Sequence, residues 1–162
     1  MKTTFAAVLL AMSLAGALAK PAYADCGDDG QPPCTGPVPT VDQVVALMTE
    51  LTDPNRPALS KTDVVTPGFA PDEAATIDDH LNSLNSRGYL PYNFVVTDIE
   101  PAPEPFAGAT VAAPKNWPYP SIPPEPIVLA NQGGHWLVTH DAAMVFLNKM
   151  WGTSRHRFVP FI

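Results

Sequence analysis

The stretch from Ile127 to Met150 constrains the fold most, because it contains two strand signals, a turn signal and a helix signal in direct succession. Its first apolar run, Ile127–Ala130, is followed by the turn residues Asn131–Gly134 and then by a second apolar run, Trp136–Val138. Two adjacent glycines readily adopt the positive φ angles that a tight hairpin turn requires. The residues from Asp141 to about Gly152 are mostly apolar at helical spacing. We therefore predict a β-hairpin followed directly by a helix.

Two further helices are predicted upstream. Thr40 and Gln43 form a capping-box pattern, which places the first helix at 41–52. The second helix is expected at 71–87, with a proline in its first turn and Gly88 directly after its end. The apolar residues that recur at helical spacing along it should form its buried face: Ala74, Ile77, Leu81 and Leu84.

Strand signals lie between the second and the third helix. In residues 92–99, β-branched and aromatic side chains recur with a period of two, which predicts a strand. The second face of this pattern is also partly apolar, so we expect the strand in the centre of the sheet. Residues 106–113 are a weaker strand candidate. The stretch 101–126 holds almost half of the chain's 20 prolines, so we expect mostly loop or polyproline II there. Within it, 117–120 (Trp-Pro-Tyr-Pro) is either a recognition surface or a loop folded back on the sheet.

The order of these elements predicts an α+β domain, in which helices pack on one face of a curved antiparallel sheet. A cystatin-like or NTF2-like cone is the nearest common architecture. We expect a signal peptide at 1–24, a flexible leader rich in Pro, Gly and Asp at 25–39, the α+β domain at 40–151 and a tail at 152–162. The tail ends in apolar residues, so it should act as an extra strand or a docking arm.

The N-terminus has the pattern of a secretory signal peptide. Lys2 precedes an uncharged apolar run, and small residues favour cleavage between Ala24 and Asp25, with cleavage after Ala19 as the alternative. The run is shorter than the roughly 20 residues that span a membrane, and no later stretch is long enough. We therefore expect a secreted protein, extracellular or associated with the cell envelope.

Two cysteines and an acidic composition fit this location. Cys26 and Cys34 have neither a Cys-x-x-Cys spacing nor a neighbouring histidine, so in an exported chain they should form a structural disulfide. The chain has 9 basic and 16 acidic residues, a formal net charge of −7. An acidic surface repels phosphate, which argues against binding to nucleic acid or to anionic lipid.

Several short stretches, in this order, resemble one known family. They are Pro39-Thr40, Leu51-Thr52-Asp53-Pro54-Asn55, Leu90-Pro91 followed by 94–101, Asn131-Gln132-Gly133-Gly134 with Trp136, and 143–147. Together they are similar to the low-molecular-weight secreted culture-filtrate antigens of mycobacteria, over roughly 39–150. The cysteine pair, the proline content of 115–126 and the tail depart from that pattern. The resemblance implies an exported, immunogenic protein with no assigned reaction and no catalytic residues to carry over.

The residues themselves predict no catalytic, cofactor-binding or metal-binding site. A nucleophile elbow, a phosphate loop and a zinc signature are all absent from the sequence. A ketosteroid-isomerase-like use of a cone pocket is the one enzyme class that the expected fold leaves open. Its candidate residues would be Tyr92, Asp98 and His80.

Our leading hypothesis is a non-catalytic, antigen-type binding or envelope-associated module whose partner is a protein or a small apolar ligand. The alternative is a small cavity enzyme, or a carrier for an apolar ligand. A third hypothesis is a homodimer that packs through the open face of the sheet. An interior filled by Met48, Phe94, Trp136 and Phe146 would favour the module over the enzyme.

Overall fold

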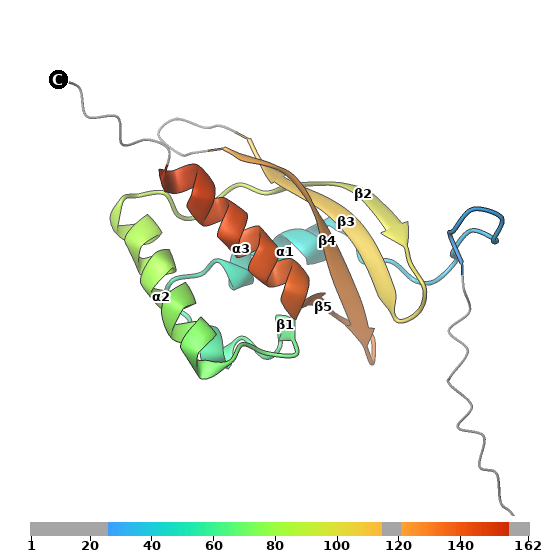
Figure 1. The fold of residues 1–162 in the computed structure, drawn as a ribbon, viewed down its shortest axis with the longest axis horizontal. Coiled ribbons are helices and arrows are strands. Elements are labelled where there is room, and N and C mark those ends of the chain that lie inside the picture. Colours follow the sequence, from blue (N-terminus) through green and yellow to red (C-terminus); the bar gives the residue numbers. More distant parts are fainter. Residues whose placement is uncertain (1–25, 115–120, 156–162) are drawn as a thin grey trace, which may run out of the picture.

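The computed structural model describes residues 26–114 and 121–155, with side chains up to Gly152 in the last helix. The predicted signal peptide with its cleavage site between Ala24 and Asp25, the segment 117–120 and the tail from 156 onward lie outside these residues. The elements in chain order are α1 (Val41–Leu51), the 3-10 turn η1 (Ala58–Ser60), β1 (Val65–Thr66), α2 (Pro71–Ser86), β2 (Val95–Pro101), β3 (Phe106–Ala113), β4 (Ile122–Gln132), β5 (His135–Thr139) and α3 (His140–Arg155) (Figure 1).

The five strands form one sheet in the order β1-β5-β4-β3-β2, which together with the helices confirms the α+β class. The expectation of a purely antiparallel sheet is wrong, because the short β1 pairs with β5 in parallel and makes the sheet mixed. Between β1 and β5 the chain passes through α2 and the other three strands, and a connection of this length allows two neighbouring strands to run in the same direction. The cystatin-like or NTF2-like cone stays a prediction.

The predicted hairpin and the helix after it are confirmed. β4 and β5 pair through Asn131 opposite Trp136 and Gln132 opposite His135. The two glycines between them have φ angles of 61° and 91°. The Asn131 side-chain oxygen accepts a hydrogen bond of 2.9 Å from the Gly134 N–H across the turn. α3 continues to Arg155, past the predicted end at Gly152, because a helix tolerates one glycine at a cost of about 1 kcal/mol.

β2 does not lie in the centre of the sheet, as its sequence predicts, but at the edge, where it pairs only with β3. It begins at Val95, and this residue is 47% exposed on the open face. The pairing with β3 shifts register between Thr97 and Glu100, and Asp98 within this bulge has a φ angle of 51°. Bulges are a common device for blunting sheet edges. Apolar residues on both faces therefore gave a misleading signal here.

The proline-rich segment also differs from its prediction, because part of it is a strand. β4 begins at Ile122 and includes Pro123, Pro124 and Pro126. It pairs with β5 only from Leu129 onward, so among the described strands its first half has a single neighbour, β3. A proline whose nitrogen faces an unpaired edge removes no hydrogen bond from the ladder.

The helix boundaries follow the predicted signals closely. At α1, the Gln43 N–H donates to the Thr40 hydroxyl over 3.2 Å, and the Thr40 N–H donates to the Gln43 side chain over 2.9 Å, which confirms the capping box. α2 ends at Ser86, and Gly88 follows with a φ angle of 71°. The predicted buried face of α2 is correct at all its positions: Ala74, Ile77, Leu81 and Leu84.

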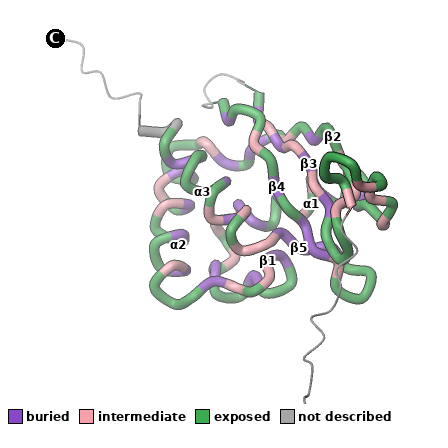
Figure 2. The backbone as a smooth tube through the Cα atoms, turned by 45° about the vertical axis from the view of Figure 1, so that its right-hand side comes forward, coloured by how far each residue is buried: buried purple, intermediate pink, exposed green. Residues whose placement is uncertain are grey.

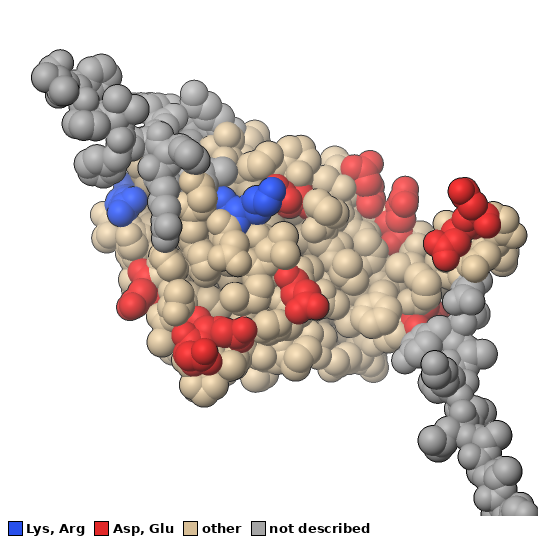
Figure 3. All heavy atoms as spheres, viewed as in Figure 1, with Lys and Arg blue, Asp and Glu red and all other residues tan. Residues whose placement is uncertain are grey.

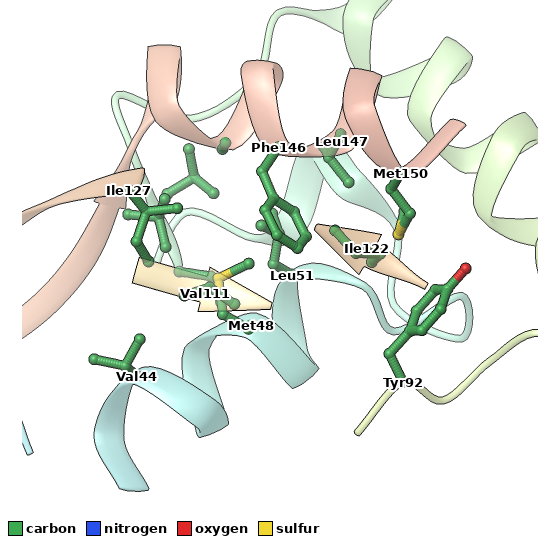
Figure 4. Close-up of a cluster of buried hydrophobic side chains, with 14 of the residues drawn as sticks. Val44, Met48, Leu51, Tyr92, Val111, Ile122, Ile127, Phe146, Leu147 and Met150 are labelled. Carbon is green, nitrogen blue, oxygen red and sulfur yellow. The ribbon is translucent and has the colours of Figure 1, made fainter. Parts of the chain in front are cut away.

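The interior is one continuous hydrophobic cluster formed by the helices and the sheet (Figure 2). Figure 4 shows Met48 and Leu51 of α1 pointing toward Phe146 and Leu147 of α3. Met48 and Phe146 are 0% and 1% exposed, and the Phe94 ring meets the Phe146 ring at a centroid distance of 6.0 Å. These side chains fill the space in which a central cavity would lie.

The leader is described from Cys26 onward and has neither helix nor strand. Cys26 and Cys34 form the predicted disulfide. Pro37 lines a small hollow together with Phe106 and Asn131, so the end of the leader lies against the turn between β2 and β3. Among the described helices, none is both long and apolar enough to cross a bilayer.

Candidate functional site

An open groove of about 830 Å³ lies on the described part of the chain. We call it the α1–β5 groove. It runs between the outer side of α1, the connection from Arg56 to Val64 and the tip of the β4–β5 hairpin. Its lining residues are Gln43, Ala46, Leu47, Glu50, Arg56, Thr62, Asp63, Val64, Gln132, Gly134, His135, Trp136 and Leu137.

An arginine paired with two carboxylates forms the charged rim of the groove. Arg56 Nη1 lies 3.4 Å from Glu50 Oε2 on α1, and Nη2 forms an ion pair with Asp63 Oδ1. Nη2 also donates to the Ser60 carbonyl over 3.0 Å. The hydrogen bond from Arg56 lowers the pKa of the Asp63 carboxyl and raises the pKa of the guanidinium. Both partners therefore stay charged near neutral pH.

Apolar side chains form the floor of the groove. Trp136 and Leu137 come from β5 and are 9% and 5% exposed, and Leu47 of α1 is partly buried beside them. Gln132 reaches from the hairpin to β1, where its side-chain nitrogen donates to the Thr66 hydroxyl over 2.7 Å. This bond ties the hairpin to the β1 edge of the sheet.

A buried lysine holds the connection that carries Arg56. Lys61 is 0% exposed, and its ammonium donates to the carbonyls of Leu51 over 2.7 Å and Asp53 over 2.9 Å. These carbonyls lie at the C-terminal end of α1, where the helix dipole favours a positive charge. Burial lowers the pKa of Lys61 to about 8, against the attraction of Asp53.

The other side of the connection is attached to α2. Asp78 Oδ1 accepts a hydrogen bond of 2.8 Å from the Ala58 N–H. The sequence does not predict this contact, because the two residues lie 20 positions apart. No periodicity or motif marks either anchor. The groove wall is therefore fixed by contacts that a linear pattern does not contain.

None of the three predicted pocket candidates lines the α1–β5 groove. Tyr92 is buried just before β2. Asp98 is exposed in the edge bulge, where its carboxylate accepts a hydrogen bond of 2.8 Å from the Thr97 hydroxyl. His80 lies on α2 and stacks on Trp151 of α3 at a centroid distance of 4.2 Å.

One ion pair between helices was missed by the sequence. His140 Nε2, at the start of α3, lies 2.9 Å from Glu73 Oε2 in the first turn of α2. The same oxygen accepts a hydrogen bond of 2.9 Å from the Ala70 N–H. The bond to Glu73 raises the pKa of His140, and the bond from His140 lowers the pKa of Glu73.

Neither the carboxylates around Arg56 nor the His140–Glu73 pair belongs to a candidate metal site in the described part of the chain. Across 26–114 and 121–155, no three His, Cys, Asp or Glu side chains lie close enough together to hold an ion. The surface is predominantly acidic, and acidic groups outnumber basic ones on the face drawn in Figure 3.

These features define a small α+β domain with a buried hydrophobic core, a disulfide-closed leader and the open α1–β5 groove. A family model described as "Low molecular weight antigen MTB12, C-terminal domain" matches residues 37–154. The chain therefore belongs to this antigen family, which confirms the resemblance seen in the sequence.

Curated relatives agree with that family. Over 117 residues the chain is 35% identical to the low molecular weight antigen MTB12 of Mycobacterium bovis and equally to that of Mycobacterium tuberculosis. Each match covers 71% of this chain and 68% of the relative. An MTB12 homologue of Mycobacterium leprae is 29% identical over 110 residues, which cover 68% of this chain and 65% of the relative. The region that the family model matches, 37–154, contains the whole sheet and the α1–β5 groove.

Proposed function

We propose that this antigen-type protein is exported and acts by binding a partner, without catalysis, and that the α1–β5 groove is its binding site. The observation that carries the proposal is the contrast between the interior and this groove. Met48 and Phe146 are buried in the hydrophobic core, whereas the groove combines an apolar floor with charged groups at its rim. Specific binding sites typically combine these two features.

The arrangement of polar groups favours binding over chemistry. Arg56 is engaged by two carboxylates, those of Glu50 and Asp63. The candidates for an isomerase-like site do not line the groove: Tyr92 is buried before β2, Asp98 is exposed in the edge bulge and His80 lies on α2. Export is supported by the signal-peptide pattern before Asp25 and by the disulfide, which is a bond typical of oxidising compartments.

Native mass spectrometry of the protein from culture medium tests this proposal. We expect a chain that begins at Asp25 and carries a non-covalent adduct. Ala46→Arg places a long side chain in the groove, and Ala75→Arg makes the same change on an exposed position of α2. The adduct should disappear only with Ala46→Arg. Retention of the full-length chain in the cells would contradict export, and an adduct that survives Ala46→Arg would contradict the groove as the site.

A further inference from the structure

We propose that the α1–β5 groove binds a segment of a partner protein in which lysine or arginine side chains lie next to apolar ones. This inference rests on the proposed function, which places binding in the groove, and it adds the chemical class of the partner. Three features carry it: the balance of charge at the rim, the apolar floor, and the distance of the groove from the chain's own basic tail.

The rim attracts cations and offers little to an anion. The terminal nitrogens of Arg56 are already bonded to Glu50, Asp63 and the Ser60 carbonyl, so an anionic ligand would have to displace a carboxylate. The two carboxylates outnumber the guanidinium, and their side chains are 52% and 68% exposed. Each uses one oxygen for Arg56, and the other oxygen accepts no hydrogen bond from a described side chain. A cationic group can therefore bind there without breaking an existing pair.

The floor accounts for the apolar part of the partner. Leu47, Leu137 and Trp136 line the same groove as the two carboxylates, and Leu47 is the most exposed of these three apolar side chains. The aliphatic stem of a lysine or arginine, and an apolar neighbour, can cover such a surface while the charged head stays at the rim. A volume of about 830 Å³ leaves room for several side chains. The groove therefore fits a short amphipathic segment better than an isolated cation.

The chain itself contains such a segment, because basic and apolar residues follow one another in 155–162. α3 starts at His140, three residues after the groove residue Leu137, and ends at Arg155, and its 16 residues place Arg155 about 24 Å from His140. The seven remaining residues extend at most about 25 Å. Nearly all of that length would be used in returning to the groove, so a partner is the better occupant.

Titration of the ¹⁵N-labelled protein with three octapeptides tests the inference. The peptides alternate leucine with lysine, with glutamate or with serine. We expect the lysine peptide to shift the backbone amides of 43–50, 56–64 and 132–137, and the other two peptides to bind more weakly. Glu50→Gln combined with Asp63→Asn should weaken the lysine peptide about tenfold, because two exposed ion pairs are lost. It should also strengthen binding of the glutamate peptide, because Arg56 is released from its partners.

The charge-matched control is Asp79→Asn combined with Glu100→Gln, two exposed positions outside the groove. An equal loss of affinity in this control would show general attraction to an acidic surface and overturn the inference. Equal binding of all three peptides in the groove would refute the cationic class and leave the groove as a binding site. If no peptide moved the groove amides, the inference would fail, whereas the proposed function would still be decided by the native-mass adduct and its loss with Ala46→Arg. If deletion of 156–162 moved them, the occupant would be the chain's own tail and the partner would be excluded.

Discussion

Lys61 provides the sharpest test of the structure, because its ammonium is buried and its pKa is lowered from 10.5 to about 8. Below pH 8 both the folded and the unfolded chain carry this proton, so Lys61 adds no pH dependence. Between pH 8 and 10.5 the unfolded chain binds the proton and the folded chain does not. The free energy of unfolding must therefore rise with pH in this window. A pKa difference of this size corresponds to about 3 kcal/mol.

The assay is urea unfolding at pH 7, 8, 9 and 10 on the wild type and on Lys61→Met. At pH 7 the variant should be less stable by about 2 kcal/mol, because the buried Leu51 carbonyl loses its donor. The difference between the two proteins should grow by about 3 kcal/mol toward pH 10.5, since only the wild type gains stability there. Disulfide exchange cannot interfere within the described chain, because both described cysteines are paired.

Lys149→Met is the matched control, because Lys149 is 56% exposed and its ammonium pairs with Glu125 at the surface over 3.3 Å. Its unfolding free energy should follow that of the wild type across the pH range. Parallel pH curves for the wild type and Lys61→Met would refute the reasoning. Such a result would mean that the Lys61 ammonium is solvated in the folded protein.

Three further outcomes are expected. The pKa of His140 is raised in the folded protein, so its ion pair with Glu73 stabilises the fold below about pH 6.5, and this stabilisation is lost as the pH rises through the pKa of the folded state. Glu73→Gln should therefore lower the melting temperature more at pH 6 than at pH 9. An equal drop in melting temperature at both pH values would contradict a charged pair. Reduction of the Cys26–Cys34 disulfide should lower the free energy of unfolding by at most about 3 kcal/mol. The far-ultraviolet circular dichroism should not change, because the described leader has no helix or strand. A loss of helical signal on reduction would show that the leader supports the domain. Phe146→Ala should cost about 3 to 5 kcal/mol in urea unfolding, because it opens a cavity in the centre of the core; a loss below about 1 kcal/mol would mean that the interior is not packed as described.

Local signals in the sequence were sufficient for the helices, the hairpin and the fold class. The capping box at Thr40, the apolar face of α2 and the glycine pair at 133–134 act over a few residues, and the structure confirms each of them. The cysteine pair also depends on a short separation. The conformational preferences behind these signals are properties of the local chain, so a linear pattern contains them.

The order of the strands could not be obtained in this way. Apolar residues on both faces of 95–99 suggested a central strand, but whether a strand lies at an edge depends on which other strands pair with it. The prolines of β4 led to the opposite error, because they suggested a loop where the structure has a strand. They exclude a strand only where both edges are paired, and pairing is decided by tertiary structure.

The candidate site depended on tertiary structure almost entirely. Arg56 and Asp63 lie in a connection without periodicity, and they form a rim only because Lys61 attaches that connection to the end of α1 and Asp78 attaches it to α2. The sequence by itself determined an acidic α+β chain with an export signal pattern, a local disulfide and membership of the antigen family. The tertiary structure decided where the open groove lies and which charges meet there, because contacts between residues distant in sequence depend on the packing of the whole chain.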